Sequence, residues 1–171
     1  MKHHHWIVAL LAVATTWNTK TAHAQTLDAD LQRSSIQELV TAAREMGDAT
    51  RGAIVFHQPS MACAKCHVVG GEPQATLGPD LSSLGHAVSD EALVESVLHP
   101  SKTIRQGYES ITVLTSDGRL IAGIPTEQTS EKVVIRDAAR IGETVSIAVA
   151  DIEEIKPNEL SIMPAGQMNQ L

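Results

Sequence analysis

The segment Cys63-Ala64-Lys65-Cys66-His67 constrains this chain more than any other feature. Its spacing, C-x-x-C-H, is typical of the site at which a haem is attached covalently. The two thiols can add to the two vinyl groups of one porphyrin, and the histidine that follows can bind the iron as its fifth ligand. We therefore predict one haem c, held by Cys63 and Cys66, with its iron bound to His67.

Three other interpretations of these residues are a disulfide, half of a zinc site and a thioredoxin-like redox pair. A structural zinc site needs two more ligands at similar spacing, and the chain has only 2 cysteines. A thioredoxin-like pair follows a strand and begins a long helix. Residues 58–60 and 68–71 instead indicate loops on both sides of the motif, which favours the haem interpretation.

Residues 1–24 have the organisation of a secretory signal peptide. Lys2 supplies a positive charge, residues 6–14 are apolar, and Ala-His-Ala at 22–24 is a cleavage site of the small-x-small type. Nine apolar residues cannot cross about 30 Å of hydrocarbon, so we expect a cleaved signal and not a membrane span. Covalent haem of this kind is assembled outside the cytoplasm, and the predicted location is the bacterial periplasm.

The charge of the chain narrows the class of partner. Lys and Arg number 13 and Asp and Glu 20, a formal net charge of −7, and cleavage before residue 25 would remove two lysines and leave −9. This balance argues against binding to nucleic acid or to an anionic membrane. It favours a partner protein that carries a basic patch.

Helical patterns dominate the first two thirds of the chain. Residues 25–47 predict an N-terminal helix that ends at Gly47, with an apolar stripe formed by Leu31, Leu39, Val40, Ala43 and Met46. Residues 48–107 form the haem-attachment part, with helices predicted over 49–57 and 90–98 and a loop over 72–85. Asp48 and Ser89 are placed to cap the two helices.

From residue 108 the pattern changes to β-structure. Segments 111–115 and 120–124 flank Asp117-Gly118, a strong hairpin signal. Segments 132–136, 144–149 and 152–155 add three strands at short spacing, so residues 108–156 predict a five-stranded antiparallel unit. Residues 157–171 return to loop.

A sixth iron ligand would lie opposite His67, and a thioether there favours ferrous iron and raises the reduction potential. Met61 is too near the attachment segment to reach the opposite face, and Met46 fits the helix core. Met163 precedes a proline in a loop, where the backbone is extended and can present the sulfur. The full set of candidates is Met46, Met61, Met163, Met168, His57, His86 and His99.

Further motifs accompany C-x-x-C-H along residues 48–163. They are Arg51-Gly52-Ala53-x-x-Phe56, Gly78-Pro79-Asp80-Leu81, Leu93-x-Glu95-Ser96-x-Leu98-x-Pro100-Ser101, Gly107-Tyr108-Glu109, Asp117-Gly118 and Ser161-x-Met163-Pro164. Together they resemble a class I cytochrome c, and more specifically the Planctomycete-type haem-binding domain, a cytochrome c with a β insertion before its distal methionine. The resemblance implies a mainly α cytochrome c fold with a small inserted antiparallel β unit, an α+β arrangement.

The same resemblance assigns roles to residues. It implies that Met163 is the distal iron ligand and that the carbonyl of Pro79 accepts the ring N–H of His67, which would fix the imidazole. Gly52 and Phe56 would lie where the first cytochrome helix crosses the last one. Only eight residues follow Met163, so the C-terminal cytochrome helix is expected to be missing. Residues 27–46 or a partner would then cover its place, or the gene is truncated.

These features predict a periplasmic monohaem cytochrome that carries single electrons between a dehydrogenase and an acceptor, which could be another cytochrome, and not an enzyme. One alternative is a haem-based sensor or ligand-binding module. The other is a peroxidase-like enzyme, which needs acid–base groups such as Arg51 and His57 over an open iron. His57 and His86 are more simply explained as surface or loop residues.

Overall fold

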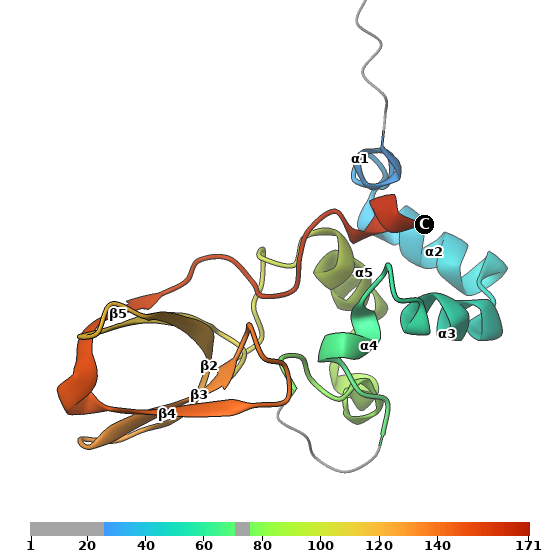
Figure 1. Cartoon of the computed structure of the whole chain (residues 1–171). Coiled ribbons are helices and arrows are strands. Elements are labelled where there is room, and N and C mark those ends of the chain that lie inside the picture. The colour runs from blue at the N-terminus through green and yellow to red at the C-terminus, as the bar shows by residue number, and fades with distance from the viewer. Residues whose placement is uncertain (1–25, 71–75) are drawn as a thin grey trace, which may run out of the picture.

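The computed structural model describes residues 26–70 and 76–171, so the predicted signal peptide over 1–24 lies outside it. Helices lie at one end of the described chain and a curled sheet at the other (Figure 1). Within these residues no helix combines the length and the apolar character needed to cross a lipid bilayer.

The helix predicted over 25–47 is two helices, α1 (Leu27–Leu31) and α2 (Ile36–Met46). Ser35 separates them because it forms a capping box with Glu38: Ser35 Oγ accepts the Glu38 N–H at 3.2 Å, and the Glu38 carboxylate accepts the Ser35 N–H at 2.8 Å. Val40 is buried, whereas Met46 is 78% exposed. The prediction that Met46 belongs to the core is therefore wrong.

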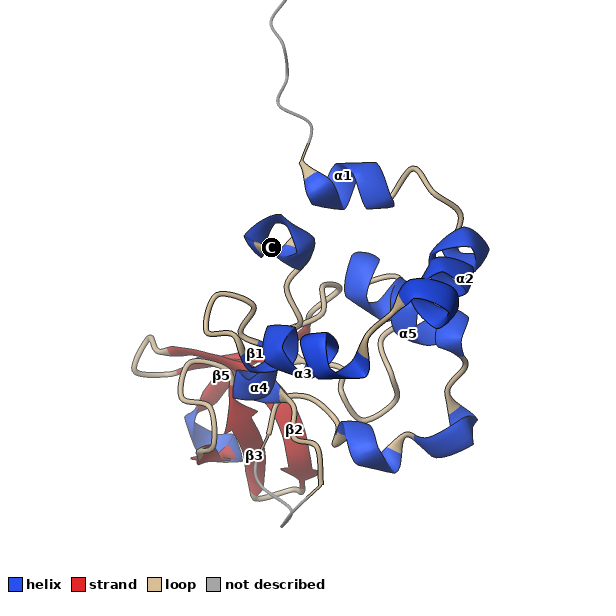
Figure 2. Ribbon diagram, turned by 90° about the vertical axis from the view of Figure 1, so that its right-hand side faces the viewer, coloured by secondary structure: helices blue, strands red, loops and turns tan. Residues whose placement is uncertain are grey.

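Two other helices have the predicted bounds. α3 (Ala49–His57) begins after Asp48, whose carboxylate accepts the Arg51 N–H at 2.9 Å. α5 (Asp90–Leu98) begins after Ser89 and packs along α2 (Figure 2). Between them lie α4 (Cys63–Cys66) and the short 3-10 turns η1 (Leu81–Ser83) and η2 (Gly85–Ala87).

The five predicted strands form one antiparallel sheet in the order β4-β3-β2-β1-β5. Their bounds are β1 (Ile111–Thr115), β2 (Leu120–Gln128), β3 (Lys132–Asp137), β4 (Thr144–Ala148) and β5 (Ile152–Pro157). Gly118 has φ of 82°, as the tight turn between β1 and β2 requires. A single turn, η3 (Val149–Asp151), connects the edge strands β4 and β5, so the sheet curls strongly (Figure 1).

The prediction of a mainly α cytochrome c fold is wrong. The α-helices are short, eleven residues at most, and α3 buries none of its residues. The cluster of buried apolar side chains lies in the sheet, where β-branched residues pack well on a pleated surface: Ile111, Val113, Val133, Ile135 and Ile147. The fold is therefore a five-stranded antiparallel sheet accompanied by short helices.

The expected helix crossing at Gly52 is also absent from the described chain. Gly52 is exposed, and a Cβ added there would meet no atom within 4 Å. After Met163 the chain forms only the 3-10 turn η4 (Gln167–Gln170), which packs against α1 and α5. Within residues 27–46, α2 packs against α5, and the Gly52 face of α3 is left uncovered.

Candidate haem-attachment site

The chain turns sharply immediately before the first cysteine. Ala62 has φ of 58° and ψ of 9°, a left-handed conformation that costs a residue with a Cβ about 1–2 kcal/mol. This turn starts α4, in which Cys63 and Cys66 are three residues apart and therefore lie on the same side of one helical turn. Both thiols are free and half-buried, while Ala64 and Lys65 between them are exposed.

The surroundings of the motif differ from those of a thioredoxin-like pair. α4 has four residues and follows a turn at residues 59–61. All strand pairs in the described part of the chain are antiparallel. A thioredoxin-like cysteine pair follows a strand and begins a long helix of a βαβ unit, so the local structure does not support that interpretation.

His67 follows α4 directly, and its ring is held by one hydrogen bond. Nδ1 lies 3.0 Å from the carbonyl oxygen of Pro79. A carbonyl oxygen can only accept, so Nδ1 is the donor, and in the neutral ring Nε2 then has the lone pair. In that tautomer Nε2 is the nitrogen that can bind a metal, and the contact with Pro79 is the one that the sequence resemblance implied.

The ring of His67 also packs directly on Gly78. A Cβ added to Gly78 would lie 2.4 Å from Cε1 and 2.5 Å from Nδ1 of the ring. The Gly78 N–H donates to the Cys66 carbonyl at 2.9 Å, and the Leu81 N–H donates to the Val68 carbonyl at 2.9 Å. The segment 78–81 therefore runs beside the motif, and only glycine fits at its closest approach. The motif Gly78-Pro79-Asp80-Leu81 did not by itself predict this role of Gly78.

Asp80 forms hydrogen bonds with Gly70 and with Ser82. Its carboxylate accepts the N–H of Gly70 at 3.0 Å and both the N–H and the hydroxyl of Ser82 at 2.8 Å. These hydrogen bonds, led by that from Gly70, lower the pKa of Asp80. These contacts of Asp80 were not predicted, although an aspartate two residues before a serine is a common turn signal.

Burial raises the pKa of the Cys66 thiol, while the nearby Lys65 opposes the shift and Cys63 adds to it. Cys66 is therefore held as a protonated thiol at neutral pH, since even an ordinary cysteine has a pKa of about 8.5. A low-pKa redox cysteine would show the opposite shift.

Met163 lies in a loop held by two serines and is itself half-buried. Its N–H donates to Ser161 Oγ at 3.1 Å, and the Ser161 N–H donates to Ser101 Oγ at 3.0 Å. Four residues later, Gln167 Nε2 donates to the Met61 carbonyl at 3.0 Å. Met61 is 1% exposed and lies two residues before Cys63, so the C-terminal segment meets the attachment segment there. No hydrogen bond joins Met163 itself to the described residues of the motif.

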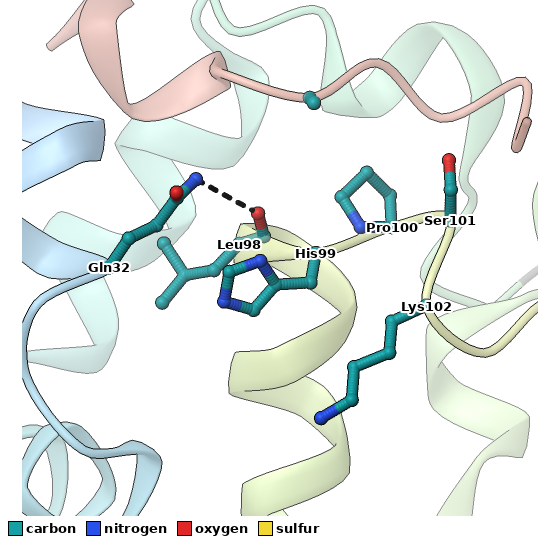
Figure 3. Close-up of a pocket in the computed structure, with 7 residues that line it drawn as sticks. Gln32, Leu98, His99, Pro100, Ser101 and Lys102 are labelled. Atoms are coloured by element: carbon teal, nitrogen blue, oxygen red, sulfur yellow. Dashed lines mark hydrogen bonds between the residues drawn. The ribbon is translucent and has the colours of Figure 1, made fainter.

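The other candidate ligands are dispersed. His99 lines an open hollow of about 440 Å³ at the end of α5, beside Gln32, whose Nε2 donates to the Leu98 carbonyl at 3.4 Å (Figure 3). Met168 lines an apolar hollow of about 390 Å³ between α2 and α5. His57 is exposed and edge-on to Phe56, with ring centroids 5.0 Å apart. The side chain of His86 lies outside the described part of the structure.

Neither hollow is lined by a residue of the C-x-x-C-H motif, and we assign the candidate site from the chemistry of the motif. Across residues 26–70 and 76–171, no three His, Cys, Asp or Glu side chains gather as they would around a metal ion held by such groups alone. No protein-family model matches the sequence, and no curated protein matches it.

Proposed function

We propose that the protein is a monohaem c-type cytochrome that carries single electrons between a dehydrogenase and an acceptor. The observation that supports this most is the arrangement of His67 beside the two free thiols. Its Nδ1 proton is bound to the Pro79 carbonyl, which leaves the Nε2 lone pair for iron. We propose no catalytic residue.

The residues of the motif fit a covalent haem. Cys63 and Cys66 project from one side of a single turn, and both are free thiols. Each thiol would add across one vinyl group: the sulfur bonds to one carbon, the proton goes to the other, and no oxidant or reductant is consumed. Bound haem would supply a one-electron iron couple. Gly78 and Pro79 would keep the imidazole in one orientation.

The same proposal includes export and an acidic surface. The pattern of residues 1–24 supports secretion to the periplasm, where covalent haem is assembled. A net charge of −9 after cleavage supports a redox partner with a basic patch, because opposite charges steer association. Met163 is the proposed distal ligand, on the basis of its loop and the sequence resemblance.

A haem-based ligand-binding module is the alternative. It is favoured by the half-buried position of Met163, which no hydrogen bond joins to the described residues of the motif. A sensor needs a displaceable sixth ligand, whereas an electron carrier gains from two firm ligands, because little rearranges when iron changes oxidation state.

Carbon monoxide binding to the reduced protein separates the two functions. The protein should be made with a periplasmic haem-attachment system and compared with the Met163→Ala variant. We expect a low-spin ferrous protein that binds carbon monoxide poorly at neutral pH and a variant that binds it readily. Rapid and complete binding by the unmodified protein would replace electron transfer by ligand binding as the proposed function.

A further inference from the structure

A hydrogen-bonded connection runs from the sheet to the loop that holds His67. It begins at Arg136 on β3, whose Nη1 donates to the Thr76 carbonyl at 2.6 Å across 60 positions of sequence. The Thr76 hydroxyl donates to the Gly78 carbonyl at 2.9 Å. Gly78 supports the ring of His67, and the next residue, Pro79, accepts its Nδ1 proton. Each contact in this series involves the loop backbone.

The guanidinium of Arg136 is held in place from a second direction. Nη2 lies 3.4 Å from the Gly107 carbonyl, and the Arg136 Cζ lies 5.3 Å from the centre of the Tyr108 ring, within cation–π range. Its Nε is buried and has no hydrogen-bond partner among the described residues. A buried donor without a partner lowers the stability of the fold. The guanidinium therefore keeps its contacts with Thr76 and Tyr108 although its Nε is left without a hydrogen bond.

We propose that Arg136 is a positioning residue for the axial imidazole, and this inference rests on the proposed haem function. Arg136 fixes Thr76, which fixes the Gly78–Pro79 carbonyls against His67. A well-aligned bond from Nδ1–H to a carbonyl makes the imidazole more basic and stabilises ferric iron. The sheet would thereby influence the reduction potential of a haem bound to His67 from outside the attachment motif.

Two substitutions at Arg136 separate this role from a simple effect of charge, because their effects on the reduction potential differ in sign. Arg136→Lys keeps the positive charge but loses the guanidinium that contacts both the Thr76 and the Gly107 carbonyls. The loop should therefore loosen, and the reduction potential of the haem should rise. Arg136→Gln also removes a cation, which by itself would lower the potential by favouring ferric iron. Arg119→Lys is the matched control, because Arg119 is exposed and pairs with Asp117 at the β1–β2 turn.

The experiment measures the reduction potential and the hydrogen exchange of the Gly78 amide in the mature protein. We expect a higher potential and about tenfold faster exchange in Arg136→Lys, a change typical of losing one charged hydrogen bond, and neither effect in Arg119→Lys. An unchanged potential and unchanged exchange in Arg136→Lys would overturn the proposal. A lower reduction potential in Arg136→Gln, with no change in Arg136→Lys, would mean that Arg136 acts only through its charge, and it would also overturn the proposal.

Two further measurements keep the test decisive. If Arg136→Lys does not accumulate as folded protein, Thr76→Val removes the hydroxyl bond to Gly78 and should shift the potential in the same direction. If the unmodified protein carries no haem, the proposed function fails. The exchange of the Gly78 amide, which is bonded to the Cys66 carbonyl, then decides whether Arg136 restrains this loop.

Discussion

Replacing Gly78 by alanine should disturb the site directly, because the added methyl group would enter the space occupied by the ring of His67. The added Cβ would lie 2.4 Å from Cε1, 2.5 Å from Nδ1 and 2.8 Å from Nε2 of His67. Carbon atoms pack at about 3.5–4.0 Å, so the ring or the loop would have to retreat by about 1 Å. The 3.0 Å contact between Nδ1 and the Pro79 carbonyl would not survive a displacement of that size.

The expected cost combines two effects. Losing the hydrogen bond costs about 1 kcal/mol, and forcing a methyl group into a packed contact costs about 1–3 kcal/mol. We therefore expect Gly78→Ala to lower the free energy of unfolding by about 2–4 kcal/mol, as measured by urea denaturation, and to reduce the haem content of the purified protein.

Gly52→Ala is the matched control for this prediction. Gly52 lies in the exposed interior of α3, and an added Cβ would meet no atom within 4 Å. Alanine is the better helix former there, so stability should rise by about 0.5–1 kcal/mol. Unchanged stability and unchanged haem content in Gly78→Ala would refute the close packing of His67 on Gly78.

Two other substitutions test different parts of the account. Met163→Ala should abolish the weak far-red charge-transfer band that sulfur on ferric haem produces, whereas Met168→Ala should leave it; the reverse result would make Met168 the ligand. Burial alone would raise the pKa of Asp137, but hydrogen bonds from the Ala139 N–H and Arg140 lower it on balance. Its stabilising effect is therefore complete above the unfolded pKa of about 3.9 and is lost as the pH falls through the lower folded value. Asp137→Asn should cost about 1–2 kcal/mol at pH 7 and reduce the loss of stability on acidification, as measured by urea unfolding at several pH values; an unchanged acid dependence would contradict this assignment.

Local signals predicted much of the secondary structure. Asp48 and Ser89 cap α3 and α5 because their side chains accept backbone N–H groups of the first turn. Asp117-Gly118 predicted the β1–β2 turn because glycine adopts positive φ without strain. Each of these features is decided by residues within a few positions of one another. The break between α1 and α2 also has a local signal, the capping box at Ser35 and Glu38, which the prediction of a single helix over 25–47 did not include.

The fold class and the long-range contacts had no such signal. The motifs that resemble cytochrome c lie mainly in the helical part, whereas the buried apolar cluster comes from strands that pair across the sheet. The contact of Arg136 with Thr76 joins positions 60 residues apart and leaves no trace in local sequence. The contact of His67 with Pro79 was predicted only from the resemblance to a cytochrome c domain. The position of Met163 opposite His67 stays a prediction.

Covalent haem at Cys63, Cys66 and His67 is the central claim, and the mass of the denatured polypeptide tests it most directly. The protein should be expressed with a periplasmic haem-attachment system, denatured under reducing conditions and extracted with acid–acetone. We expect the polypeptide to keep the mass of one haem and the pyridine haemochrome spectrum of two thioether links. The double variant Cys63→Ser/Cys66→Ser should keep neither. Complete extraction of the pigment, or a colourless polypeptide of unmodified mass, would contradict the account.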